Sequence, residues 1–361
     1  MILTSRNLVF YLAERGLLPF EAVVDGDVVV VESPSRNRNF KVIRRRGPGF
    51  FVKQIKEWGP QEVATLQREA RCYQLAQSEA PFAELAPLLP RFYAFDPARN
   101  VLVVELLPEA ESLAAYHRRT GEFPLAMAAT LGRMLGAYHR QPVEAASGSA
   151  AGIFPRLTPW VLSLHEQRTL PGLSGANAEL LQVVRQYPEF GRALEALRSQ
   201  WRAERLVHGD IKWDNCVLYA GADGTSALKV VDWEMADIGD PLWDVGAIFQ
   251  AYLAFWVMSM QIGRDTPAEQ LVERAQFPLE QMQPAIRTFW SAYRATRELD
   301  ARESGELLRR AVQYGAARLI QTTYESMYSL PQITPTALYM LQVSMNVLTR
   351  PADAVRDLLG M

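Results

Sequence analysis

The sequence predicts a bilobal α+β protein, with a small β-rich N-terminal lobe at residues 1–107 and a larger, mainly helical C-terminal lobe at residues 108–361. Two observations lead to this prediction. Short runs of alternating or β-branched apolar residues, bounded by turn residues, are concentrated before residue 107, and such runs are typical of half-buried strands. After Pro108, most segments are longer and carry their apolar residues at helical spacing.

The composition is that of an ordinary globular protein. Hydrophobic residues make up 49% and charged residues 22% of the 361-residue chain, which is long enough to bury a sizeable core. Charges of both signs are interspersed and the formal net charge is −2, so nothing indicates a nucleic-acid partner. Cys72 and Cys216 are too few for a disulfide framework, and the N-terminus is too polar for a secretory signal. We therefore expect a cytoplasmic protein.

The N-terminal lobe is predicted to begin with an amphipathic helix. Its buried face would carry Leu8, Tyr11 and Leu12. Gly16 is a suitable helix stop. Strand-like runs follow at residues 27–33, 39–46 and 49–56. A helix opened by Pro60 comes next, and a hairpin formed by residues 91–95 and 101–107 completes the lobe.

The C-terminal lobe is predicted to be helical apart from three short strands. Helices are expected at residues 125–140, at 177–203 and after residue 245. The strands are expected at residues 206–207, 216–219 and 228–234. One uncharged segment, residues 245–263, is nearly long enough to span a membrane. Its Gln and Ser residues favour a helix buried in the protein core instead, so no membrane association is expected.

Polar residues that can bind a metal and phosphate follow two of these strands. The loop HGDIKWDN occupies residues 208–215, and Asp232 follows the apolar run after it. Asp210, Asn215 and Asp232 offer the hard oxygen ligands that Mg²⁺ and a polyphosphate require. A single Asp at a strand end is commonly a turn cap. The three together indicate phosphoryl transfer, which needs an acceptor-orienting carboxylate, metal ligands and cations on the phosphates.

These motifs resemble those of the aminoglycoside phosphotransferase and choline kinase superfamily. HGDIKWDN is similar to its catalytic loop, and VVDWEMADIGDPLWDVG is similar to its metal-binding segment. The resemblance follows the whole chain in order and implies a protein-kinase-like fold that uses ATP and Mg²⁺. It also implies that Asp210 is the catalytic base, that Asn215 is a metal ligand and that Asp232 is the principal metal ligand. Because the segment reads Asp-Trp-Glu and not the Asp-Phe-Gly of protein kinases, Glu234 would offer a further acidic group to the metal.

The same resemblance assigns nucleotide-binding residues to the N-terminal lobe. Lys53, in the third strand, would hold the α- and β-phosphates, and Glu69 in the following helix would pair with it. Glu62, seven residues earlier on the same helix face, is the alternative partner. Phe51 and Lys53 fall on one side of the strand, which would bury the lysine stem. Phe51 stands where a small residue usually covers the adenine, so the choice of nucleotide base stays open.

A phosphate loop and a hinge complete the nucleotide site. The loop ESPSRNRNFKV contains no glycine, so it differs from the glycine-rich loop of protein kinases. It resembles the Ser- and Asn-containing loop of the aminoglycoside enzymes, which implies that hydroxyl and amide groups meet the phosphate. The residues expected to do this are Ser33, Ser35 and Asn39. The hinge is expected near residues 105–108, with Glu105 and Leu107 beside the nucleotide base.

Three residues around the catalytic loop receive separate expectations. Lys212 lies two positions after Asp210, where a point cation would stabilise charge on the transferring phosphate. By resemblance, His208 braces the loop, and Asp244 hydrogen-bonds its backbone from the start of the next helix. Lys212 is therefore predicted to be catalytic together with Asp210.

The predicted reaction is transfer of the ATP γ-phosphate to a hydroxyl, either on a small molecule or on a Ser/Thr residue of a peptide, as in peptide natural-product biosynthesis. The C-terminal region lacks an acidic cluster for a polycationic aminoglycoside, which disfavours an antibiotic kinase. A catalytically inactive nucleotide-binding pseudokinase is the alternative from another class. Retention of Lys53, Asp210, Asn215 and Asp232 argues against it. A helical binding protein in which the motifs arise by chance is the remaining interpretation.

Overall fold

The computed structural model describes the chain except for residues 35, 143–151, 168–172, 221–225, 261 and 263–267. The described residues pack into two units. The first contains mainly Met1–Tyr116 and Asp214–Ala236, and the second contains the described parts of residues 117–142, 155–213 and 237–361. This division by packing differs from the predicted lobe boundary at residue 107, which stays a prediction.

The first unit is built on a five-stranded antiparallel sheet with the strand order β1-β2-β3-β5-β4. The strands are β1 Val28–Pro34, β2 Arg38–Arg44, β3 Phe50–Gln54, β4 Phe92–Asp96 and β5 Val101–Glu105. All five lie where the sequence predicts them. In the register of β3 with β2 and β5, Lys53 lies opposite Asn39 on one side and Leu102 on the other.

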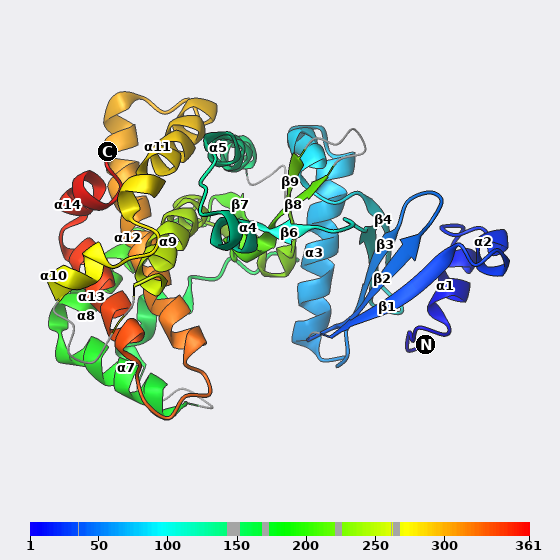
Figure 1. Cartoon of the computed structure of the whole chain (residues 1–361), viewed down its shortest axis with the longest axis horizontal. Coiled ribbons are helices and arrows are strands. Elements are labelled where there is room, and N and C mark those ends of the chain that lie inside the picture. The colour runs from blue at the N-terminus through cyan, green and yellow to red at the C-terminus, as the bar shows by residue number, and fades with distance from the viewer. Residues whose placement is uncertain (35, 143–151, 168–172, 221–225, 261, 263–267) are drawn as a thin grey trace. The chain divides into compact units, whose positions relative to one another are not determined.

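Different helices cover the two faces of this sheet (Figure 1). Helices α1 Leu8–Glu14 and α2 Phe20–Val24 lie on one side, and α3 Pro60–Ser78 lies on the other. The predicted buried face of α1 packs with apolar sheet residues that include Phe50 and Val52. Because side chains alternate along a strand, Phe51 and Lys53 point to the α3 side. The sheet therefore separates the apolar core beside α1 from the face that carries Lys53.

A second, three-stranded sheet in the same unit presents Asp232. Its order is β6-β8-β9, with β6 Glu111–Ser112, β8 Cys216–Ala220 and β9 Ser226–Val230. The prediction that the last strand reaches residue 234 is wrong. Asp232 adopts a left-handed conformation, with φ 66° and ψ 56°, which cannot continue a strand. The two-residue strand β6 was not predicted, because two residues show no periodicity.

Helix α9, Leu242–Met258, forms the centre of the second unit. Every residue of α9 except Phe255 and Met258 is buried, and the helix packs against α11 Leu279–Thr296, α12 Ala301–Ser326 and α13 Pro335–Thr349. The prediction of a core helix in this uncharged segment is confirmed. Among the described residues, no helix has both the length and the apolar character that a membrane crossing requires.

Helix α4 Leu113–Thr120 was not predicted, and the remaining α-helices and strands of the second unit agree with the sequence except at one helix and one strand. Residues 177–203 were expected to form one helix, but the structure has α7 Gly175–Gln186 and α8 Pro188–Ser199. Pro188 has no N–H to donate and forces Tyr187 into an extended conformation. Strand β7 Arg205–Val207 pairs with the unpredicted three-residue strand β10 Asp237–Gly239. The other helices are α4 Leu113–Thr120, α5 Leu125–Arg140, α10 Ala268–Glu273 and α14 Pro351–Asp353.

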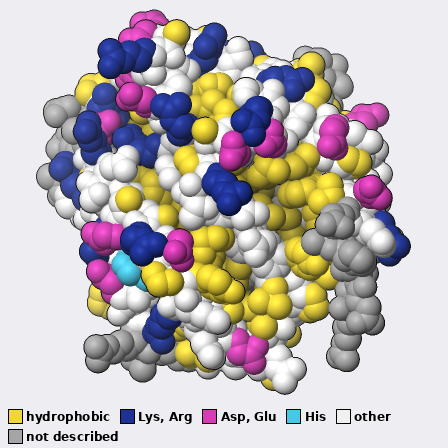
Figure 2. Space-filling model, turned by 90° about the vertical axis from the view of Figure 1, so that its left-hand side faces the viewer, with side chains coloured by type: hydrophobic (Ala, Val, Ile, Leu, Met, Phe, Trp, Pro, Cys, Tyr) yellow, Lys and Arg dark blue, Asp and Glu magenta, His cyan; other side chains and the backbone are white. Residues whose placement is uncertain are grey.

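One face of the molecule, on the side of the second unit, is seen in Figure 2. Lys and Arg side chains are interspersed with Asp and Glu, and apolar side chains lie between them. This mixture gives the face no uniform basic field of the kind that attracts a nucleic-acid backbone. It agrees with the even charge balance of the sequence.

Candidate active site

Lys53 is held between two carboxylates in the first unit. Its Nζ lies 2.7 Å from Glu69 Oε2 and 2.9 Å from Asp232 Oδ1. The predicted partner Glu69 is thus present, in preference to Glu62. Burial alone would lower the pKa of Lys53, but attraction to the two carboxylates outweighs it and raises the pKa. Lys53 therefore stays protonated at neutral pH, as a phosphate-binding cation must.

The backbone at Asp232 directs its carboxylate towards Lys53. A left-handed conformation is unfavourable for a residue with a Cβ atom, and such strain is commonly retained at functional sites. The neighbouring chain fixes it, because Val231 N donates to the Asn215 carbonyl at 2.9 Å and Trp233 is fully buried. The Asp232 side chain keeps 41% of its surface exposed. It can therefore reach a ligand as well as Lys53.

These residues line a cavity of about 680 Å³ within the first unit. The predicted nucleotide and metal residues found in its wall are Asn39, Lys53, Glu69, Glu105, Leu107, Asn215 and Asp232. Ser33 lies opposite Asn39 in the pairing of β1 with β2 and is not part of the described wall. Ser35 falls outside the described residues. Apolar side chains, among them Phe51, Leu102 and Val104, form the rest of the wall, as a flat nucleotide base would require.

Oxygen donors suited to a hard cation gather at the polar end of this cavity. The carboxylates of Glu69, Asp232 and Glu234 each offer an oxygen within 4.8 Å of the others. Both Glu69 and Asp232 contact Lys53, but the Glu69 side chain is buried whereas that of Asp232 is 41% exposed. Asp232 and Glu234 are therefore the accessible carboxylates, with the carboxamide of Asn215 in the same wall. Two carboxylates and a carboxamide fit Mg²⁺ and include no soft sulfur ligand. The donor set therefore agrees with the metal that the sequence predicts.

The predicted catalytic residues lie together in the second unit. Lys212 Nζ is 2.7 Å from Asp210 Oδ2. The Lys212 side chain is 43% exposed and the Asp210 side chain 26% exposed, so both are within reach of a substrate. On the other carboxylate oxygen, Arg318 Nη2 lies 3.4 Å from Asp210 Oδ1. A negative charge on Asp210 is thus balanced from two sides.

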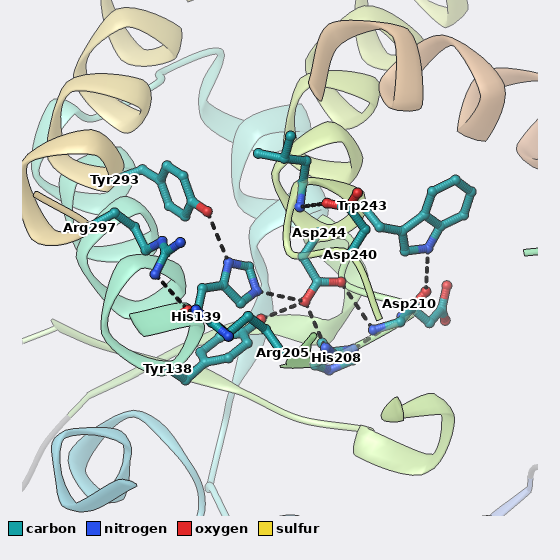
Figure 3. A network of polar contacts seen from close by, with 12 residues as sticks. Tyr138, His139, Arg205, His208, Asp210, Asp240, Trp243, Asp244, Tyr293 and Arg297 are labelled. Atoms are coloured by element: carbon teal, nitrogen blue, oxygen red, sulfur yellow. Dashed lines mark hydrogen bonds and ion pairs between the residues drawn. The ribbon is translucent and has the colours of Figure 1, made fainter. Parts of the chain in front are cut away.

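Asp244 anchors the start of the catalytic loop (Figure 3). Its fully buried carboxylate accepts hydrogen bonds from the backbone N–H of His208 at 2.6 Å, from that of Gly209 at 3.0 Å and from the Tyr138 hydroxyl at 2.6 Å. The backbone contacts are those that the resemblance implied. Burial opposes ionisation, but the contacts with His139, His208 and Tyr138 outweigh it and lower the pKa of Asp244. The loop backbone is therefore hydrogen-bonded to a carboxylate that is ionised at neutral pH.

His208 braces the loop from within, because its Nδ1 accepts a hydrogen bond from Asp210 N at 3.3 Å. Further residues of this network were not predicted from the sequence. Tyr138 and Arg318 lie 106 and 108 residues from the groups they contact, and no local pattern indicates such pairs. Tyr73, in the cavity wall, does carry a signal, because it follows Glu69 by four positions on the same face of α3.

An aromatic cluster supports the loop beyond Asp210. The ring of Trp213 lies 4.5 Å from that of His117, which also stacks on Phe123 at 4.7 Å. His117 is 2% exposed, and its Nδ1 faces the Glu122 carbonyl at 2.5 Å. Burial lowers the pKa of His117 to about 4, although the contact with Glu122 opposes this change. His117 is therefore neutral at physiological pH.

This burial predicts an acid-sensitive contribution to stability. The stability that depends on neutral His117 is present above its unfolded pKa of about 6.5 and is lost as the pH falls towards 4. In His117→Gln, which has no titrating ring, the free energy of unfolding should depend less steeply on pH over this window, by up to about 1.4 kcal/mol per pH unit. Urea denaturation between pH 4 and pH 7 measures the two slopes. Equal slopes would contradict the assignment.

The structure contains the groups that phosphoryl transfer requires. They are a protonated lysine between two carboxylates, oxygen donors for a divalent cation, and a loop that carries a partly exposed carboxylate and a lysine. Together with a small antiparallel sheet and a mainly helical remainder, they define a phosphotransferase with a protein-kinase-like fold. The model of the phosphotransferase enzyme family, APH, matches residues 27–287. The chain therefore belongs to this family, within the aminoglycoside phosphotransferase and choline kinase superfamily.

Solved structures of the superfamily share the fold at low sequence identity. A choline kinase from Cryptosporidium parvum Iowa II is 14% identical with a TM-score of 0.56, covering 99% of this chain and 98% of its own. Amicoumacin kinase hAmiN, in complex with AMP-PNP and Ca²⁺, is 11% identical with a TM-score of 0.51, covering 94% and 96%. A GDP complex of aminoglycoside 2'-phosphotransferase-IIIa is 14% identical with a TM-score of 0.52, covering 97% and 98%. No curated protein sequence matches this chain significantly.

Proposed function

We propose that this phosphotransferase moves the γ-phosphate of ATP to the hydroxyl of a small-molecule alcohol, with Mg²⁺ as its metal. The observation that carries the proposal is the position of Lys53, held by Glu69 and Asp232 in the wall of a cavity large enough for a nucleotide. The presence of Lys53, Glu69 and Asp232 together with Asp210 favours an enzyme over a nucleotide-binding pseudokinase.

The cavity wall assigns a task to each nucleotide-binding residue. Phe51 and Leu102 would lie against the base, beside the hinge at Glu105 and Leu107. Lys53 would bind the α- and β-phosphates as a point cation, and Glu69 would hold its ammonium in place. Asn215, Asp232 and Glu234 would hold Mg²⁺. When bound, the metal neutralises charge on the phosphates.

On the catalytic loop, Asp210 would orient the acceptor hydroxyl and take its proton. The hydroxyl oxygen attacks the γ-phosphorus, the bond from this phosphorus to the bridging β,γ-oxygen breaks, and ADP leaves. Lys212, on Asp210 Oδ2, would stabilise the negative charge of the transferring group. Fixing Asp210 to a loop anchored by Asp244 keeps the carboxylate in one orientation, which would hold the acceptor hydroxyl in position for attack.

The acceptor is proposed to be a small molecule because neighbours of the same fold carry the names of small-molecule kinases, for choline, amicoumacin and aminoglycosides. A Ser/Thr hydroxyl in a peptide is the second acceptor class, favoured by Lys212 at its position after Asp210. Free, buried Cys72 and Cys216 and the need for ATP support a cytoplasmic location.

A panel of acceptors tests the proposal. The chain is incubated with γ-labelled ATP, Mg²⁺ and, separately, choline, ethanolamine, kanamycin, simple amino alcohols and a Ser/Thr peptide library. Label in a small-molecule phosphomonoester supports the proposed class, and label in peptides alone moves the acceptor to the second class. Saturable Mg-ATP binding without transfer to any acceptor, including a crude metabolite extract, would favour a pseudokinase.

The contact of Lys212 with Asp210 gives a prediction about the transition state. Lys212→Ala should lower kcat and kcat/KM together by about 10-fold or more, while the Kd of ATP changes little, because the lysine acts only during transfer. Lys212→Arg should restore only part of the rate, since a guanidinium places its donors differently. Steady-state kinetics with calorimetric ATP binding measure both quantities. A Lys212→Ala protein with normal kcat would remove Lys212 from this role.

A further inference from the structure

The carbonyl of Gly209, immediately before Asp210, accepts two hydrogen bonds from side chains of different helices. Arg318 Nη1 on α12 donates to it at 2.9 Å, and Trp243 Nε1 on α9 donates to it at 3.2 Å. The N–H of the same residue is bound by Asp244. Both polar groups of Gly209 are thus fixed, in a left-handed conformation with φ 78° that favours glycine.

Arg318 contacts both the Gly209 carbonyl and the carboxylate of Asp210. Its second nitrogen, Nη2, lies 3.4 Å from Asp210 Oδ1, while its guanidinium carbon lies 5.0 Å from the centre of the Trp243 ring. The planar guanidinium therefore contacts three groups at once, which a single ammonium cannot do in the same geometry. The 3.4 Å contact is the weaker of its two hydrogen bonds, so the main effect of Arg318 is on the backbone.

The packing of α9 and α12 explains how Arg318 reaches the loop. A Cβ atom on Gly246 of α9 would lie 2.6 Å from the Ala311 carbonyl oxygen, and one on Gly315 of α12 would lie 2.8 Å from the Gly246 carbonyl oxygen. The two helices therefore touch backbone to backbone. Arg318 follows Gly315 by three residues, almost one helical turn. This close approach brings its long side chain under the loop that follows β7.

Arg318 is almost entirely desolvated, with only 4% of its surface exposed. Burying a guanidinium costs free energy unless it is paired and hydrogen-bonded. Its carbonyl, carboxylate and aromatic partners all belong to the catalytic loop or to the first turn of α9. An exposed arginine on the same helix, such as Arg309, stays hydrated and needs no such partners. The contacts with the loop therefore offset part of the cost of burying Arg318, whose Nε has no hydrogen-bond partner among the described residues.

We propose that Arg318 is a positioning residue that sets the orientation of Asp210 through the Gly209–Asp210 peptide. The proposal rests on the proposed function only in the step that Asp210 takes part in transfer. Without the guanidinium, the Gly209 carbonyl keeps one side-chain donor instead of two, and the Asp210 carboxylate can rotate towards Lys212 alone. The acceptor hydroxyl would then be held in the reactive geometry for less of the time, which lowers kcat and leaves nucleotide affinity unchanged.

The test uses the full chain with Arg318→Lys, which keeps the charge, and Arg318→Met, which keeps an unbranched stem. The matched control is Arg310→Lys, because Arg310 is a partly buried arginine of α12 that pairs with a different aspartate, the buried Asp240, at 3.3 Å. Amide hydrogen exchange of peptides that cover residues 206–213 reports on the loop without requiring activity. Steady-state kinetics and calorimetric ATP binding report on catalysis and on the folded fraction.

We expect exchange at residues 208–213 to accelerate at least 10-fold in Arg318→Met, with no change in peptides from α3. We also expect kcat to fall about 100-fold in Arg318→Met and about 10-fold in Arg318→Lys, while the KM and Kd of ATP stay within about twofold. Arg310→Lys should keep the parental kcat and loop exchange. Unchanged loop exchange in Arg318→Met would overturn the proposal. A loss of kcat in Arg310→Lys as large as that in Arg318→Lys would also overturn it.

The two claims fail in different ways. If the parent protein transfers phosphate to no acceptor, the proposed function is refuted, and loop exchange alone decides whether Arg318 positions Asp210. If the parent is active and Arg318→Met keeps its kcat despite faster loop exchange, the positioning role is refuted and the proposed function stands.

Discussion

Asp210→Asn should reduce phosphate transfer by about 100-fold or more and leave the affinity for Mg-ATP within about twofold of the parent value. The carboxamide keeps the shape of the side chain and can still accept a hydrogen bond from Lys212. It lacks the charge needed to take the acceptor proton and to attract Lys212 and Arg318, which lie 2.7 and 3.4 Å from the carboxylate oxygens. The loss should therefore appear in kcat.

Single-turnover transfer from γ-labelled ATP, with calorimetric ATP binding on the same preparations, measures this separation. Asp214→Asn is the matched control, because Asp214 lies in the same loop and has an exposed side chain. It should retain the parental rate. Full transfer by Asp210→Asn would show that another group orients the acceptor hydroxyl.

Asp232→Asn should weaken Mg-ATP binding itself, by about 10-fold or more, which corresponds to about 1.4 kcal/mol. The substitution removes a charged oxygen from the cation site and one of the two carboxylates that hold Lys53, now 2.9 Å from Asp232 Oδ1. Lys53 keeps Glu69 as its partner, so the fold should persist. Binding of ATP in the presence of EDTA should change far less than binding in the presence of Mg²⁺.

Calorimetric titrations with and without Mg²⁺ separate the metal contribution from the lysine contribution. Glu62→Gln is a suitable control, because Glu62 lies in the first turn of the helix that carries Glu69 but does not pair with Lys53. An Asp232→Asn protein with the parental Mg-ATP affinity would contradict the assignment of Asp232 as a metal ligand.

The sequence was sufficient to predict groups whose relation depends on a strand, a helix or a short loop. The alternation of β3 places Lys53 on the side of α3, and Glu69 meets it there. The resemblance of the second motif to the family implied that Asp244 binds the loop backbone, and the structure places Asp244 in the first turn of α9, where it does so. Each of these relations needs only a local element and one packing contact.

Contacts made through packing could not be predicted from the sequence. Arg318 reaches the Gly209 carbonyl only because Gly246 and Gly315 let α9 and α12 approach each other, and these residues are far apart along the chain. The conformation of Asp232 was also missed, because the run 228–234 has the composition of a strand to its end. Its left-handed backbone is imposed by the neighbouring contacts of Val231 and Trp233, not by local propensity.

The most direct test of the central claim is transfer of label from γ-labelled ATP into a pool of small metabolites in the presence of Mg²⁺, with the parent chain and Asp210→Asn compared at equal ATP occupancy. The account predicts that the parent produces a labelled, phosphatase-sensitive phosphomonoester and that Asp210→Asn produces at least about 100-fold less. Label that appears only as inorganic phosphate, or equally with both proteins, would contradict it.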